Sequence, residues 1–172
     1  MGVVASAASY DREGLTGPLK RPYADSGVVL VVSSRSSVRQ LNDLHGQKIG
    51  VMVGTIEHEW LAKHDFRVSV FASQEDIIAA IEAGEIEVGT TNPVTIGWYR
   101  HEHPSTAVRV PDGYEPELEL RWSVSVGLRR ADDALLAAVD TALAQLVEQR
   151  IPAEIYAKYG ISYLPSSGQG LQ

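Results

Sequence analysis

The segment Asp43–Trp60 reads Asp-Leu-His-Gly-Gln-Lys-Ile-Gly-Val-Met-Val-Gly-Thr-Ile-Glu-His-Glu-Trp, and it decides the fold of the chain. A short apolar run, Lys48–Val53, is typical of a β-strand, and Gly54 and Thr55 follow it directly. An apolar helical period then begins at Ile56. The segment therefore predicts a strand, a glycine turn and a helix.

The turn after this strand is a candidate binding corner. Gly54 allows a tight turn and Thr55 can cap the helix, so the free amides of the first helical turn face the space beyond the strand. Such a corner suits a carboxylate or a phosphate. The alternative is that Thr55 only caps the helix, because such caps are common. Glu57 and Glu59 complement the helix dipole and oppose a bound anion, so chemistry alone leaves both interpretations open.

Composition indicates a globular chain that can build one sizeable core or two small ones. The chain has 172 residues, 44% of them hydrophobic. Its net charge of −7, without any run of Lys or Arg, argues against a nucleic-acid binder. The absence of cysteine excludes disulfides, thiolate metal sites and cysteine nucleophiles. The longest apolar run is far short of the ~20 residues that span a bilayer.

Strand and helix patterns alternate along the chain. The run Val28–Val32 is typical of a strand that is buried on both faces. Further strands are predicted over residues 2–8, 66–71, 85–91, 105–110 and 119–128, and helices over residues 73–84, from Pro93, over 132–149 and up to Lys158. This order predicts the α/β class, with βαβ units and a mainly parallel sheet covered on both sides.

In open sheets of this kind, ligands bind beyond the carboxyl ends of the strands. Gly54-Thr55 and Thr91-Asn92 both lie at such ends. The coincidence favours one shared site over two unrelated turns.

Several motifs resemble a known family in their order and spacing. Asp43–Val51 followed by Gly54-Thr55, then Ala80–Val88, a long helix and Ile155–Gly160, resemble the extracytoplasmic solute-binding proteins of ABC transporters, family 3. These are the type II periplasmic binding proteins. Arg21-Pro22-Tyr23 is similar to the Pro-Tyr that opens the first hinge in that family. The resemblance covers nearly the whole chain.

The resemblance implies two α/β lobes joined by two hinge strands, with solute trapped between the lobes. Residues 1–33 would form part of lobe one and the first hinge strand, and 34–119 would form lobe two. Residues 120–165 would form the second hinge strand and the C-terminal helices of lobe one, and 166–172 a flexible tail. One lobe would be complete, with a parallel-type sheet, and the other partial.

Family members carry about another half-lobe and a signal peptide before this point. We therefore expect self-association through exposed sheet edge and apolar surface. By resemblance, the expected location is the periplasm and the expected partner a membrane permease.

The resemblance also implies solute-binding residues. In amino-acid-binding members, a Thr matching Thr55 and an Arg near the position of Arg12 hold the α-carboxylate, and an Asp near the position of Asn92 holds the amino group. With Gly54 and Ile56, these make up the predicted site. An amide cannot neutralise an ammonium group, so Asn92 disfavours an ordinary α-amino acid. The expected solute is small and polar or anionic.

Simpler interpretations stand beside these roles. Arg12 can be a solvated loop arginine, and Asn92 can be the cap of the helix that Pro93 begins. His101-Glu102-His103 has no third metal ligand at helical spacing.

Two other functions stay open. The loop Tyr10-Asp11, Arg21–Tyr23 and Tyr159–Ile161 resemble the accessory binding-protein homologues encoded beside periplasmic quinoprotein methanol dehydrogenases, which would bind the dehydrogenase instead of a solute. A dehydratase-like enzyme on the same fold, dependent on Glu57 or Arg12, is more distant. No motif for a nucleophile elbow, a phosphate loop, a zinc protease or a dinucleotide fold is present. We predict a binding module that is not an enzyme and uses no cofactor.

Overall fold

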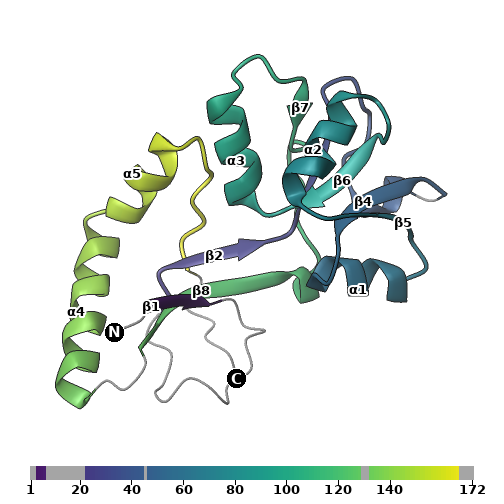
Figure 1. The fold of residues 1–172 in the computed structure, drawn as a ribbon. Helices are drawn as coiled ribbons and strands as arrows, with labels where there is room; N and C mark the ends of the chain where they lie inside the picture. The colour runs from purple at the N-terminus through teal and green to yellow at the C-terminus, as the bar shows by residue number, and fades with distance from the viewer. Residues whose placement is uncertain (1–2, 7–21, 45, 129–131, 167–172) are drawn as a thin grey trace. The chain divides into compact units, whose positions relative to one another are not determined.

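The computed structural model describes residues 3–6, 22–44, 46–128 and 132–166 (Figure 1). Arg12, the loop Tyr10-Asp11 and the tail 167–172 lie outside these residues. The chain divides into two units. The first comprises residues 1–26, 121–158 and 162–172, and the second comprises residues 27–120 and 159–161.

The second unit is built on a five-stranded sheet with the order β5-β4-β6-β3-β7 (Figure 1). Strand β4 is parallel to both β5 and β6, which confirms the predicted βαβ units. Strand β3 runs antiparallel to β6 and β7, so the sheet is mixed at this side. The strands are β3 (Val29–Ser33), β4 (Lys48–Met52), β5 (Arg67–Phe71), β6 (Val88–Thr91) and β7 (Val108–Arg109).

Helices cover both faces of this sheet. They are α1 (Ile56–Lys63), α2 (Gln74–Glu82) and α3 (Pro93–Glu102), with short 3-10 turns at Leu41–Leu44 and Leu118–Leu120. Leu61 of α1 packs into one buried cluster, and Ile77 of α2 and Ile96 of α3 pack into another. Leu30 of β3 belongs to the first cluster and Val31 to the second, which confirms a strand buried on both faces.

Helix α2 lies close to the sheet because two strand residues are glycines. A Cβ atom at Gly89 would lie 2.1 Å from Cγ2 of Ile77. At Gly50 it would lie 3.1 Å from the same Cγ2 of Ile77, and 2.6 Å from Cδ1 of Ile86, which follows α2. Real Cβ atoms essentially never come within 3.0 Å of another atom, so the lack of a side chain at Gly89 above all allows α2 to lie this close to the sheet.

Two strands of this unit are shorter than predicted. Strand β6 begins at Val88 instead of Glu85, because Gly84 has φ +74° and the amide of Glu85 still donates to Ala80 of α2. The strand expected over 105–110 is reduced to the two residues of β7.

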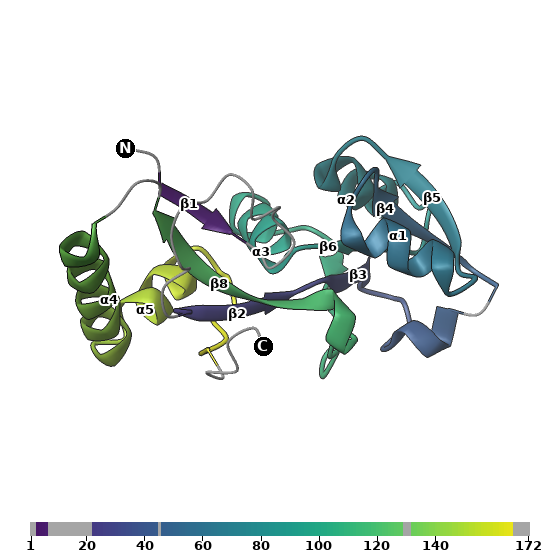
Figure 2. The ribbon, with the colours of Figure 1, turned by 90° about the horizontal axis from the view of Figure 1, so that it is seen from below.

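The first unit has a three-stranded sheet with the order β1-β8-β2 (Figure 2). Its elements are β1 (Val3–Ser6), β2 (Ala24–Gly27), β8 (Arg121–Leu128), α4 (Asp133–Glu148) and α5 (Ile151–Lys158). The Tyr163 hydroxyl donates to the carbonyl of Tyr23 at 2.6 Å, and the Asp25 amide donates to the carbonyl of Leu164 at 2.9 Å. These bonds attach the C-terminal segment to β2.

The long helix α4 carries the apolar face that its spacing predicts, and this face is partly covered, with Leu135, Val139 and Leu143 half-buried. Leu136 is buried, whereas Leu146 is 41% and Val147 39% exposed. Neither α4 nor any other helix in the described parts of the chain is long and apolar enough to cross a bilayer.

Candidate functional site

The sheet brings two predicted binding segments to one edge. Strands β4 and β6 are parallel neighbours, with Gly50 opposite Gly89. Gly54–Ile56 and Asn92 follow these strands at their carboxyl ends, so the structure places them at the same edge of the sheet. We call Gly54, Thr55, Ile56 and Asn92 the carboxyl-end corner.

Thr55 is held by hydrogen bonds within its own turn. Gly54 has φ +72°, which only glycine adopts readily, and this turn sets Thr55 at the N-cap of α1. Its hydroxyl donates to the carbonyl of Met52 at 2.9 Å and accepts the amide of His58 at 3.4 Å. The Gly54 amide donates to Nδ1 of His58 at 3.3 Å. The capping role of Thr55 is thus confirmed, and its role toward a solute stays a prediction.

Asn92 is likewise the N-cap of α3. Its Oδ1 accepts the amide of Thr95 at 2.8 Å. Its Nδ2 and its backbone amide donate to Oε1 of Gln74 at 3.0 and 3.1 Å. Gln74, at the start of α2, is 8% exposed. The sequence pattern did not predict this contact, because Gln74 and Asn92 approach each other only when α2 and α3 are in place.

Two polar side chains beside the corner are buried. Glu57, in the first turn of α1, is 4% exposed. Thr91, the last residue of β6, is fully buried, and its hydroxyl has no hydrogen-bond partner within the described residues. The burial of Glu57 had a signal in the sequence, because it precedes the core residue Leu61 by one helical turn.

The rest of the corner is apolar and open. Ile56 is 42% exposed, and the neighbouring Val53 is 58% exposed. Arg12, the predicted carboxylate clamp, lies outside the described residues, so only four of the five predicted site residues have a described position.

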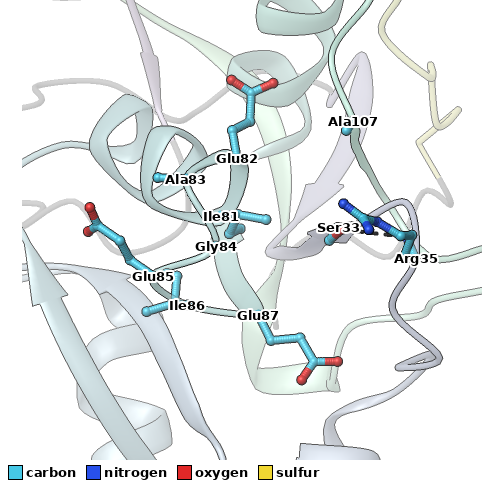
Figure 3. Close-up of a pocket in the computed structure, with 10 residues that line it drawn as sticks. All are labelled: Ser33, Arg35, Ile81, Glu82, Ala83, Gly84, Glu85, Ile86, Glu87 and Ala107. Atoms are coloured by element: carbon cyan, nitrogen blue, oxygen red, sulfur yellow. Dashed lines mark hydrogen bonds between the residues drawn. The ribbon is translucent and has the colours of Figure 1, made fainter.

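A hollow of about 390 Å³ lies at the opposite edge of the same sheet, where β6 begins (Figure 3). Figure 3 shows the carboxylates of Glu82, Glu85 and Glu87 pointing in different directions around it, with Arg35 to one side. Glu87 accepts the hydroxyl of Ser36 at 2.8 Å. These carboxylates do not converge on one point, so the hollow is a weaker candidate than the corner.

Glu82 accepts hydrogen bonds from the hydroxyls of Thr106 and Tyr99. The bonds from Thr106 and then Tyr99 lower the pKa of the Glu82 carboxyl. The bond to Glu82, with partial burial and the nearby negative charge, raises the pKa of Tyr99 to about 12. The Glu82 carboxylate thus joins α2 to α3 through Tyr99, and to the segment before β7 through Thr106.

The end of α3 carries the His101–His103 motif. His101 stacks on Trp98 with ring centroids 5.5 Å apart, and His103 stacks on Tyr99 at 4.3 Å. Across the described ranges, no group of three or more His, Asp or Glu side chains could hold a metal ion.

Comparisons with known proteins identify the architecture. No protein-family model matches the sequence, and no curated protein is a significant match. The fold is similar to the L-cystine solute receptor of Neisseria gonorrhoeae in its unliganded open conformation, with a TM-score of 0.74 at 16% identity over 91% of this chain and 68% of that one.

Two further solved structures have a similar fold. A substrate-binding domain of a putative amino acid ABC transporter from Streptococcus pneumoniae has a TM-score of 0.69 at 18% identity, over 90% of this chain and 70% of that one. An ancestral cationic amino acid solute-binding protein has a TM-score of 0.73 at 19% identity, over 90% of this chain and 66% of that one. The chain thus spans about two thirds of the length of each of the three. It has the type II periplasmic-binding-protein fold, with one complete lobe and part of a second.

Proposed function

We propose that the chain is the solute-binding module of an ABC-type importer outside the cytoplasm, and that its solute is small and polar. The observation that carries this proposal is the arrangement of the carboxyl-end corner. Two helix N-termini, those of α1 and α3, begin at neighbouring parallel strand ends. Ligands of open α/β sheets bind at this position, and helix N-termini offer polar groups to them.

The fold and its relatives support the same function. The similar solved structures include a cystine receptor and a substrate-binding domain of an amino acid transporter. A non-catalytic role agrees with these relatives, which are binding proteins. The membrane permease is the proposed partner, because a solute-binding module delivers its cargo to one.

The test is a thermal-shift screen of the purified chain against amino acids, small carboxylates, amines and phosphate. We expect at least one solute to raise the melting temperature. Thr55→Val is expected to abolish the shift, and Thr55→Ser, which keeps the hydroxyl, to retain it. Asp132→Ala is the matched control, because it removes a comparable N-cap bond, to Leu135, from α4 in the other unit. It is expected to lower stability and leave the shift unchanged.

A chain that melts cooperatively and responds to no solute contradicts the proposal. The accessory function would then be the better account. Its direct test is mixing with a periplasmic quinoprotein methanol dehydrogenase and looking for a complex by size-exclusion chromatography.

A further inference from the structure

Strand β5 forms one edge of the five-stranded sheet (Figure 1). It pairs with β4 along its whole length, and no second strand pairs with it among the residues the structure describes. Its only charged side chain, Arg67, is at the first position, and the strand contains no proline and no bulge against β4. Natural edge strands usually carry such guards, because free backbone groups can pair with another chain. This edge is therefore open to pairing.

The register with β4 shows which backbone groups point away from the sheet. The carbonyl of Phe71 accepts the amide of Val53 at 3.0 Å, so the backbone groups of Phe71 point toward β4. These directions alternate along a strand, so the backbone groups of Ser69 also point toward β4. The N–H and C=O groups of Val68 and Val70 point outward, where the described residues supply no partner strand.

The same edge carries exposed apolar side chains. Val68 packs partly against the core cluster that includes Leu61 of α1, so Val68 and Val70, two positions apart, share the α1 face of the strand. Val70 is nevertheless 51% exposed, and Val53, whose amide is bonded to β5, is 58% exposed. A partner along β5 would cover Val70 and pair the outward backbone groups at once.

A second copy of β5 fits this edge in an antiparallel register. With a twofold axis through Ser69, the two strands overlap completely, and Val68 of one copy lies opposite Val70 of the other. Both residues carry outward backbone groups, so each such pair exchanges two hydrogen bonds, about four in all. Arg67 lies opposite Phe71 of the second copy, so the strands place no like charges directly opposite each other.

The charges of α1 favour the same arrangement. Helix α1 packs on β4 and β5, so its counterpart in the second copy would lie on the same face of the joined sheet. The twofold axis makes the two helices antiparallel. Exposed Glu59 lies in the first turn and exposed Lys63 in the last, so the acidic end of each helix is on the side of the basic end of the other.

We propose that β5 is a pairing edge and that its occupant is β5 of a second copy of the chain, in the antiparallel register centred on Ser69. The two five-stranded sheets then form one continuous sheet. This inference goes beyond the proposed function and requires no solute. A short edge pairing buries little area, so we expect a reversible dimer that forms at roughly 10 µM to 1 mM.

The register is tested with single cysteines, because the chain has none of its own. In the proposed pairing the two Ser69 Cα atoms are about 4.5 Å apart, within reach of a disulfide. The two Val70 Cα atoms are roughly 9 Å apart, which is too far. Under mild oxidation of the full chain, we expect Ser69→Cys to give a linked dimer on a non-reducing gel. Val70→Cys should give little, although Val70 is the more exposed position.

The backbone pairing is tested by sedimentation velocity of the full chain at increasing concentration. Val70→Pro removes an outward N–H and no bond to β4, so it should weaken dimerisation at least about tenfold. Val70→Thr keeps the N–H and a similar shape, and is expected to dimerise like the unaltered chain. Circular dichroism checks that each variant is folded. If Val70→Pro is not, the two cysteine variants decide.

Three outcomes overturn the inference. The first is a chain that stays monomeric up to about 1 mM, where even small interfaces associate. The second is a dimer that a folded Val70→Pro variant leaves intact. The third is a cross-link that forms as readily through Val70→Cys as through Ser69→Cys, because collision and not the proposed register would then explain it.

Discussion

At the scale of single residues, the clearest electrostatic pair of the second unit is Glu82 with Tyr99, joined by a hydrogen bond of 2.7 Å. The bond requires a carboxylate and a neutral phenol. It therefore lowers the pKa of Glu82, and in Tyr99 it raises the pKa from an ordinary value of 10.0 to about 12. The stability from Glu82 is present above its ordinary pKa and is lost as pH falls through the lowered one. The stability from Tyr99 is full below pH 10 and is lost as pH rises toward about 12.

Glu82→Gln is expected to bring the pKa of Tyr99 down from about 12 toward its ordinary value, because the largest cause of the shift is the bond to Glu82. The measurement is tyrosinate absorbance against pH, with Tyr99→Phe used to assign the transition. A Tyr99 transition that keeps its pKa in Glu82→Gln would show that burial, and not the hydrogen bond, sets its value.

At the scale of elements, the second unit depends on the close contact between α2 and the sheet. Gly89→Ala places a methyl group 2.1 Å from Cγ2 of Ile77, which is a rigid branch on a buried side chain. We expect the substitution to lower the free energy of unfolding by about 1–3 kcal/mol, as overpacking of a core does.

The measurement is chemical denaturation followed by circular dichroism. Adding Ile77→Leu should recover part of the loss, because leucine has no Cγ2 branch at that point, and neighbouring residues give non-additive effects. Full additivity of the two substitutions would mean that the clash is relieved elsewhere in the sheet.

At the scale of the whole molecule, the two units differ in how the chain builds them. Both buried clusters of the second unit lie within the continuous segment 27–120, whereas the first unit is assembled from three separate segments. A domain with its own core can fold alone. The second unit therefore has what it needs to fold by itself, apart from residues 159–161.

We expect a polypeptide of residues 27–120 to fold and to melt cooperatively, as measured by circular dichroism. Its melting temperature should be below that of the whole chain, because it lacks Ile161, which packs against Gly97 of α3. Ile77→Ala is the control that should remove or greatly weaken the transition. A fragment that melts without cooperativity would show that the first unit is required for the second to fold.

The sequence alone determined the elements and their order. Local signals carry that information: Gly54-Thr55 makes a turn and a cap, Ser73 and Asn92 cap the next two helices, and the apolar run Val28–Val32 has to be buried on both faces. The order of strands and helices also predicted that Thr55 and Asn92 follow strand ends at one edge of the sheet, because βαβ order fixes which ends meet. Their role as N-caps was predictable too, because a cap is a contact within one turn.

The tertiary structure decided what depends on contacts between distant segments. Three features join residues that lie far apart in the sequence, and no local pattern encodes them. They are the antiparallel pairing of β3 with β6, the contact of Gln74 with Asn92, and the close approach of Ile77 to Gly89. The contact of Gln74 with Asn92 bears most directly on the candidate site. In the sequence Asn92 is the cap of the helix that Pro93 begins, and only the packing of α2 beside α3 gives its side chain a second partner. Such contacts depend on how the helices pack, so the surroundings of a site residue are set by the tertiary structure and not by the local sequence.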